Sequence, residues 1–318
     1  MNYYKTTITA ILFLLLISLL SYHWIFPENG NYKFRPETGR GLLSWTKPLQ
    51  PCIIETMDDT IPGKTHILGV DNRGYDLAFG LSVALWTNIW LAISGALVFT
   101  ILATFGGVLI GYNQLPNTES FYQRLKRKRS LGRKLQGTKL IQTIVKLIIQ
   151  VLHAIPLLLL LLIVVIVANK LYENDLVRMF VIMMAIGVLS IPKLALLIRD
   201  RIRVLEDEEF INAARASGLS DKKIVLIHIL WYECSPVIAG QFIYVVVQAI
   251  MLEAVISFLG YGFGIDHTSL GGLIVQYQGN FPGTIGGNPL ALLPLLVLLV
   301  IAIVGNGLTN LFMDMRNE

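Results

Sequence analysis

The stretch that decides the fold is LAISGALVFTILATFGGVLIGY, residues 91–112, which holds no charged side chain. Its length suits the roughly 20 apolar residues that a helix needs to cross a bilayer. The charge-free block around it runs from Leu77 to Thr118 and is too long for one perpendicular helix at about 1.5 Å per residue. We therefore expect two elements: an interfacial helix over the mixed sequence FGLSVALWTNIW, residues 79–90, and a span over 91–112.

Apolar blocks of similar length, with at most two charged residues each, recur on both sides of this stretch. Hydrophobic residues make up 54% of the 318-residue chain and charged residues only 15%, where soluble proteins have about 25%. The further spans that we expect are 6–26, 143–168, 177–198, 235–257 and 290–312. The predicted fold class is an all-α polytopic membrane protein with six transmembrane helices.

The first span allows two interpretations, a cleaved signal peptide or an uncleaved anchor. Tyr22, His23 and Trp24 occupy the place where a small-residue cleavage site would lie, and aromatic residues suit a membrane interface. We favour the anchor. The domains that we expect are the anchor at 1–26, a small external segment at 27–76, and a membrane core at 77–318.

The distribution of Lys and Arg predicts the orientation of the spans. Residues 113–146 hold nine basic residues and one acid, Glu119, so this loop is expected in the cytoplasm. Alternation then places both termini and residues 199–234 in the cytoplasm, and 258–289 outside. The cluster Lys126–Arg129 also fits nucleic acid or anionic lipid, but orientation alone requires a basic loop, so we expect no nucleic-acid partner.

A search for catalytic chemistry finds almost nothing. Pro62-Gly63-Lys64-Thr65 resembles the end of a phosphate-binding loop, but Asp58 stands where the first glycine belongs. The histidines lack metal-ligand spacing, and the two cysteines, Cys52 and Cys234, form no paired motif. We expect no metal, no cofactor and no enzymatic activity.

The cytoplasmic segment EDEEFINAARASGLSDKKIVLIHILW, residues 206–231, stands out. Its acids favour a helix start, Gly218 favours a helix end, and Ser220 and Asp221 favour the cap of a second helix near Lys222. Small side chains at Ala213, Ala214 and Ala216 let another surface approach closely. The pattern predicts a helical hairpin, which either docks a partner or packs on its own bundle.

Four motifs, in order along the chain, now carry a resemblance. Residues 212–230 resemble the EAA loop of ABC importer permeases, through Asn212-Ala213-Ala214, Gly218 and His228-Ile229-Leu230. Three more resemble motifs of the dipeptide, oligopeptide and nickel permease family. They are His66–Asp76 (HxLGTDxxGRD), Glu253–Gly260 (EAALSFLG) and Gly305–Leu308 (GDGL). Of these three, His66–Asp76 and Gly305–Leu308 are similar to motifs of the second of the two permease subunits.

The resemblance implies a fold, a function and partners. The fold is that of a type I importer permease, which supplies half of a pore for di- or oligopeptides in a bacterial cell membrane. The partners are a second permease, two ATPase subunits that hydrolyse the ATP, an extracytoplasmic solute-binding protein, the peptide and the lipid bilayer. The residues that the resemblance assigns to ATPase coupling are Asn212, Ala213, Ala214, Arg215, Gly218 and Asp221.

The region after the fifth span is the second candidate site. An ionisable residue within a membrane span is costly to bury and tends to be functional, which singles out Glu253. We expect Glu253, Ser257 and Phe258 at the pore or outer gate; helix capping or pairing with a partner subunit are alternatives for Glu253. The glycine-rich segment that follows fits an outer mouth or a structural loop.

Departures from the family pattern leave the cargo open. Asn212 replaces a glutamate, Trp231 a proline, Asn306 an aspartate and Leu270 a tryptophan. Nickel or another small solute is the alternative cargo. A membrane-embedded enzyme, a passive channel and an exporter are rival classes; the spans lack a catalytic constellation, and a docking hairpin would serve no purpose in a channel.

Overall fold

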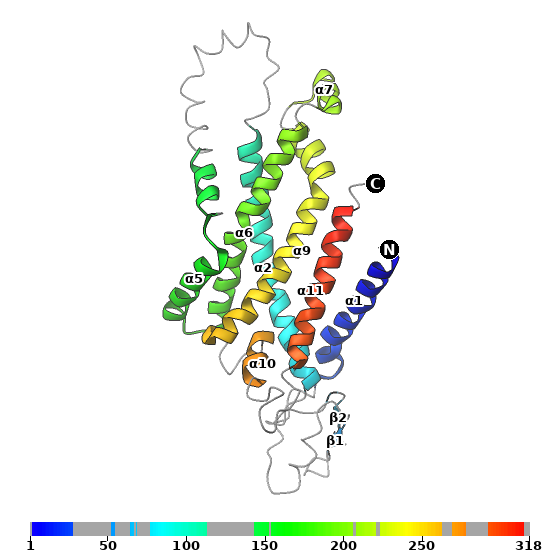
Figure 1. The fold of residues 1–318 in the computed structure, drawn as a ribbon, viewed down its shortest axis with the longest axis vertical. Coiled ribbons are helices and arrows are strands. Elements are labelled where there is room, and N and C mark those ends of the chain that lie inside the picture. Colours follow the sequence, from blue (N-terminus) through cyan, green and yellow to red (C-terminus); the bar gives the residue numbers. More distant parts are fainter. Residues whose placement is uncertain are drawn as a thin grey trace. The chain divides into compact units, whose positions relative to one another are not determined.

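The structure of the chain is a computed structural model that describes residues 2–27, 52–54, 64–66, 68, 77–112, 143–152, 154–205, 208–220, 223–262, 269–277 and 292–314. Its helices are α1 (Asn2–Ile25), α2 (Leu77–Tyr112), the helix Thr143–Leu152, α5 (Leu157–Leu171), α6 (Asp175–Leu205), α7 (Glu209–Ala216), α9 (Ser235–Ile256), α10 (Leu270–Tyr277) and α11 (Leu292–Asp314). Two wider, π-helical segments are η3 (Ile224–Cys234) and η4 (Ser257–Tyr261). Figure 1 shows these elements along the chain.

Helices long and apolar enough to cross a membrane account for most of the described chain. Five such helices are present there, or six when the bent pair Thr143–Leu152 and α5 counts as one span. The predicted helical membrane class is therefore confirmed. The described strands are a short antiparallel ribbon of β1 (Cys52–Ile54) and β2 (Lys64–His66), in which Cys52 pairs with His66.

The expected break in the charge-free block is absent, so the prediction of a separate interfacial helix at 79–90 is wrong. α2 runs as a single helix of 36 residues through Leu77–Tyr112. The polar residues that suggested an interface are buried instead: Ser82 and Asn88 are both 0% exposed. Their mixed polarity reflects contacts with other helices, and the stretch holds no proline to end the helix.

The predicted span 143–168 is not straight. The helix Thr143–Leu152 and α5 meet at an angle of 92°. Pro156 directly precedes α5, where a proline lacks the N–H group and disfavours helical geometry in the residue before it. The other spans agree with prediction within a few residues, except that α6 continues to Leu205, beyond the predicted end at 198.

The described chain divides into two compact units, and α2, α5, α6, α9 and α11 each contribute to both. Unit 1 comprises Met1–Ile93, Val165–Met183 and Val246–Leu308, and unit 2 comprises Ser94–Val164, Met184–Val245 and Thr309–Glu318.

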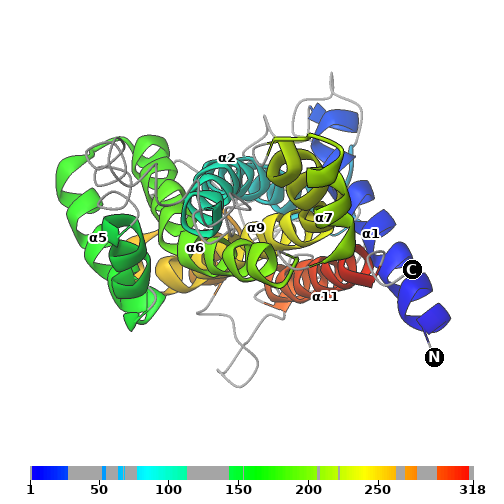
Figure 2. The same ribbon diagram turned by 90° about the horizontal axis from the view of Figure 1, so that it is seen from above.

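In unit 2, α2 and α6 pack closely along a row of glycines. Figures 1 and 2 show the two helices side by side. A side chain at Gly187 would collide with the carbonyl of Gly95, and one at Gly107 would lie 2.8 Å from the Ala195 carbonyl oxygen. Gly111 likewise faces Ile202. The GxxxG pair Gly107 and Gly111 therefore packs within the chain, as such pairs do where helix backbones approach closely.

In unit 1, α11 packs against two helices through the glycines of its GDGL-like motif. Gly305 lies against Val247 of α9, and Gly307 lies against Thr9 of α1, where an added side chain would come within 2.6 Å. Asn306, between them, is exposed. The motif's two glycines thus explain how one helix fits closely against two neighbours.

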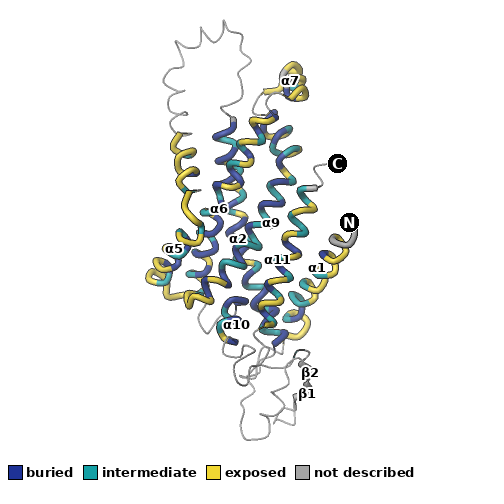
Figure 3. The backbone as a smooth tube through the Cα atoms, in the orientation of Figure 1, coloured by how far each residue is buried: buried dark blue, intermediate teal, exposed yellow. Residues whose placement is uncertain are grey.

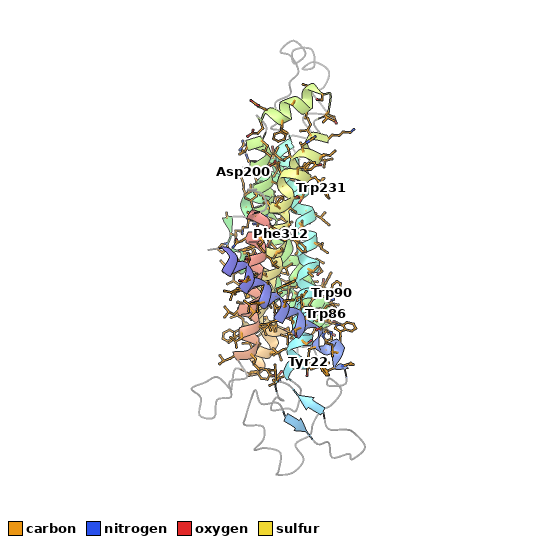
Figure 4. All side chains as sticks on the ribbon, turned by 90° about the vertical axis from the view of Figure 1, so that its right-hand side faces the viewer. Tyr22, Trp86, Trp90, Asp200, Trp231 and Phe312 are labelled. Atoms are coloured by element: carbon orange, nitrogen blue, oxygen red, sulfur yellow. The ribbon has the colours of Figure 1, made fainter. Side chains whose placement is uncertain are left out.

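The N-terminal helix joins unit 1 through polar and aromatic contacts with α2. The ring nitrogen Nδ1 of His23 lies 2.8 Å from the Ser82 hydroxyl, and the Ser82 hydroxyl donates to the Leu20 carbonyl at 3.3 Å. Trp24 meets Trp86 edge-on, and Trp86 meets Trp90 the same way. Figure 4 shows Trp86 and Trp90 along α2 near Tyr22.

Candidate functional site

The predicted hairpin is present in unit 2, and its first helix is α7. Gly218 has φ of 83°, a left-handed conformation that glycine adopts without the penalty of a side chain. The backbone N–H of Leu219 donates to the Ala214 carbonyl at 3.2 Å, across the glycine. This bond is the mark of a Schellman helix end. The prediction that Gly218 ends the helix is confirmed.

One face of α7 is buried and the other is exposed. Ile211 is 0% exposed and α7 contacts η3, whose Ile224 and Val225 are also buried. Ala213 and Ala216 are exposed, while Ala214 is half-buried. Figure 3 shows α7 as mainly exposed. The predicted small-residue surface therefore exists, centred on Ala213 and Ala216, and with Ala214 at its edge.

The second helix of the hairpin is not a separate element. From Ile224 the helix continues through η3 and α9 into η4, where Gly260, with φ of 87°, has a non-helical conformation and ends it. It begins near Lys223, as predicted, and Lys223 makes no side-chain cap bond. Asp221 and the side chains of Asn212 and Arg215 lie outside what the structure describes. The hairpin is therefore joined directly to the fifth span.

The second candidate site, in unit 1, centres on a fully buried carboxylate. Glu253 is 0% exposed. Its Oε1 accepts hydrogen bonds from the hydroxyls of Ser257 at 2.6 Å and Ser269 at 2.7 Å. Its Oε2 accepts from Asn88 Nδ2 at 2.8 Å and, at 3.3 Å, from the Gly271 backbone N–H. Four donors thus compensate for burying this side chain.

The bonds of Glu253 connect four segments of unit 1. They join α9, the start of η4, Asn88 of α2 and the N-terminal end of α10. No Lys or Arg among the described residues forms an ion pair with Glu253. The arrangement holds the short helix α10 in place, and Figure 3 shows that helix as mostly buried.

Two glycines fit around Ser257, the second predicted gate residue, which is 3% exposed. A side chain at Gly271 would lie 2.6 Å from the Ser257 Cβ atom, and one at Gly262 would collide with its hydroxyl. Phe258, the third predicted residue, is 60% exposed and stands apart from the buried carboxylate. The structure therefore brings Glu253 and Ser257 together but not Phe258.

Sequence reasoning missed Asn88 and Ser269 as partners of Glu253. Both are 0% exposed, and both are distant from Glu253 in sequence. The sequence signal for Asn88 is a polar residue in a charge-free helix. That signal predicted a membrane interface, whereas the structure has a buried contact. Leu270, which stands where the family has tryptophan, is also 0% exposed and begins α10.

Neither site contains a cluster with metal-ligand character. No group of three His, Cys, Asp or Glu side chains gathers within the described segments. What the two sites offer instead is an exposed small-residue surface in unit 2 and a buried polar network in unit 1.

Comparison with known proteins decides the family. Residues 132–315 match the family described as "Binding-protein-dependent transport system inner membrane component", and this range holds more than half of the chain. The chain belongs to this family. The match includes α7, the Gly218 turn and Glu253 with its partners Ser257, Ser269 and Gly271, whereas Asn88 lies outside it.

Relatives within the permease family have names that refer to peptide transport. A Brucella suis biovar 1 protein named as a candidate peptide transport permease is 26% identical over 219 residues, which are 68% of this chain and 62% of the relative. The oligopeptide transport system permease protein OppC of Lactococcus lactis subsp. lactis is 25% identical over 76% of this chain and 73% of its own length. This chain spans about three fifths of the Brucella protein.

A similarity to a solved permease structure is weaker. An inward-facing structure of the MetNI methionine ABC transporter covers 74% of this chain and 96% of its own, at 15% identity and a TM-score of 0.48. An overlap of this quality adds nothing to the assignment. The family match confirms the motif-based resemblance to importer permeases.

Proposed function

We propose that this chain is one of two permease subunits of an ATP-driven importer and forms half of its pore, with di- or oligopeptides as cargo. The observation that carries the proposal is the exposed small-residue face of α7 in a chain of the binding-protein-dependent family. Relatives named for dipeptide and oligopeptide transport support the choice of cargo.

The proposed partners follow from this role. Two cytoplasmic ATPase subunits dock on the hairpin, a second permease completes the pore, and an extracytoplasmic solute-binding protein delivers the peptide. This chain supplies no catalytic residue, because ATP hydrolysis belongs to the ATPases. The spans lie in the lipid bilayer. The basic loop at 113–146 faces the cytoplasm, because short loops rich in Lys and Arg stay on that side of the membrane.

The proposed mechanism is mechanical. Closure of the ATPase dimer on ATP moves α7, and the continuous helix of η3 and α9, from Ile224 to Ile256, carries that movement into the membrane span. Nucleotide binding thereby biases an equilibrium between inward and outward access, which is how a ligand shifts a two-state protein. The proposed coupling residues are Asn212, Ala213, Ala214, Arg215, Gly218 and Asp221.

The proposed role of the Glu253 cluster is to shape the outer end of the pore. Glu253 and Ser257 hold α10 in position, and the exposed Phe258 lies at the outer gate. The bonds of Glu253 support an indirect role, since its oxygens are occupied by protein donors.

Docking is tested with the variant Ala213→Glu and the complete transporter. The exposed position should accept the new side chain without loss of folding, whereas the added charge and bulk should reduce co-purification of the ATPase subunits about tenfold. The control is Asn174→Asp, which adds the same charge and keeps the cap that Asn174 provides to Leu176 and Val177. Wild-type ATPase binding by Ala213→Glu would contradict the proposed docking face.

Orientation in a bacterial inner membrane, with both termini in the cytoplasm, is a separate part of the proposal. With alanine in place of Cys52 and Cys234, a cysteine introduced at Ser130 should react with a membrane-impermeant maleimide only after the cells are opened. Reaction in intact cells would place residue 130 outside and show that the chain has the opposite orientation.

A further inference from the structure

An ion pair closes the base of the hairpin. Arg201, near the end of α6, donates from Nη2 to Oε2 of Glu233, near the end of η3, at 3.1 Å. Both residues belong to unit 2. Their side chains are 24% and 34% exposed, respectively. The pair thus joins two helices that are 32 residues apart in sequence.

The residues enclosed by this pair are those of the hairpin. The chain leaves α6 after Arg201, forms α7 and the Gly218 turn, and returns through η3 to Glu233. Each partner lies next to a buried neighbour: Ile202 is 0% exposed and Cys234 is 1% exposed. The two ends of the pair are therefore anchored in packed helices, and the hairpin projects between them.

We propose that Arg201 and Glu233 are positioning residues that link the two legs of the hairpin, so that movement of α7 reaches α6 and the fifth span together. The proposal rests on the proposed coupling role of the hairpin. Without the pair, this side-chain link between α6 and η3 is lost, and each leg can respond separately.

The geometry suits a contact that can move when the transporter changes conformation and that contributes little to the stability of the fold. The contact uses one guanidinium nitrogen, and Nε of Arg201 has no partner among the described residues. A single, partly exposed contact of this kind is worth far less than a two-point arginine–carboxylate pair. Its loss should therefore leave stability nearly unchanged while it weakens coupling, which separates a positioning role from a structural one.

The neighbouring ion pair provides the matched control. Arg199 and Asp200 form a contact of 2.6 Å between adjacent residues of α6, so this pair links nothing across helices. Asp200 is exposed, and Figure 4 labels it on α6. Asp200→Lys therefore makes the same change of charge as Glu233→Lys, close to the same place, without touching the link.

The experiment uses the complete transporter, co-purified with its ATPases, in which alanine replaces Cys52 and Cys234 and a reporter cysteine replaces Val204, an exposed residue of α6 beyond the predicted span. The reaction rate of this cysteine with a maleimide is measured with and without ATP and vanadate. Glu233→Lys should reduce the nucleotide-dependent change in that rate about fivefold, the lower end of a typical coupling effect. The double variant Arg201→Glu with Glu233→Lys should restore it, and Asp200→Lys should leave it within twofold of wild type.

The outcomes separate the inference from the function on which it rests. Wild-type protein that recruits no ATPase would overturn the proposed function and the link together. Normal ATPase recruitment with a Glu233→Lys response equal to that of wild type, or no nucleotide response at position 204 even without Glu233→Lys, would overturn the link alone. The same holds if the charge-exchanged double variant fails to recover, or if Asp200→Lys is as defective as Glu233→Lys.

Discussion

The Glu253 cluster buries its polar residues, whereas the α7 hairpin exposes its small residues. Around Glu253, in unit 1, every carboxylate oxygen is used, and Asn88, Ser269 and Glu253 are all 0% exposed. On α7, in unit 2, Ala213 and Ala216 face outward and Gly218 has nothing within 4 Å of its missing side chain. In the first region the described residues satisfy both carboxylate oxygens but leave the buried Oδ1 of Asn88 without a partner, whereas the second region offers a surface that the described residues do not cover.

This difference predicts which substitutions should affect folding and which should affect assembly. A buried network is costly when one member is lost, because the remaining donors then lack partners. An exposed turn has few partners to lose. Variants of the two regions should therefore separate into those that lower stability and those that lower coupling, and each prediction below tests that separation.

The largest effect is expected for Glu253→Ala. The substitution leaves the donors of Asn88, Ser257, Ser269 and Gly271 without their common acceptor, which should lower the stability of the protein by about 3 kcal/mol. Thermal unfolding in detergent, followed by size-exclusion chromatography, measures the loss. Glu253→Gln should keep part of the stability, since an amide oxygen still accepts.

The matched control for Glu253 is Asn306→Ala in α11, which removes an exposed polar side chain from a membrane helix. Its unfolding temperature should stay close to that of wild type. Equal losses in Glu253→Ala and Asn306→Ala would mean that the buried network contributes no special stability.

A smaller loss of stability is expected for Gly271→Ala. The added methyl group would lie 2.6 Å from the Ser257 Cβ atom and 2.8 Å from the Ala254 Cα atom, and overpacking of this kind costs about 2 kcal/mol. Gly80→Ala in α2 is the control, because no atom lies within 4 Å of the new methyl group. Alanine at position 80 should be neutral or stabilising, through its higher helix propensity. The contrast fails if both alanines destabilise alike.

Gly218→Ala should have the opposite effects to Gly271→Ala, with weaker ATPase association and unchanged stability of the membrane helices. No atom obstructs the new methyl group, so the cost comes only from φ of 83° and amounts to about 1 kcal/mol at the end of α7. The strain falls on the hairpin, and the membrane helices should unfold at their normal temperature. Co-purification of the ATPases should fall while the unfolding temperature stays unchanged; the opposite result would place Gly218 in the folding core.

The sequence predicted the helices well where one physical rule dominated. Long apolar runs with few charges predicted α1, α6, α9 and α11 within a few residues, apart from the end of α6, because burying charge in a bilayer is costly. It failed where polar residues have tertiary partners. Ser82 and Asn88 suggested a break in α2, but their partners, His23 and Glu253, lie far away in sequence. Pattern alone does not reveal such pairs.

The two candidate sites were predictable to different degrees for the same reason. Gly218 acts through its own backbone conformation, so its role in ending α7 is visible in a local stretch of sequence. The contacts of Glu253 with Ser269, and of Arg201 with Glu233, join segments 16 and 32 residues apart. Long-range pairs of this kind depend on how the helices pack.

The smallest effect is expected for Asn212→Glu, which restores the residue of the family pattern on α7. If the ATPase offers a basic group there, a charge-assisted bond exceeds a neutral one by about 1 kcal/mol, and ATPase association should strengthen roughly fivefold. If the ATPase surface has adapted to asparagine, the added charge should weaken association instead. Either result, measured as the affinity of purified ATPase for the transporter in nanodiscs, places position 212 at the interface. An unchanged affinity, with Ala213→Glu still defective, would confine the docking face to Ala213, Ala216 and the Gly218 turn.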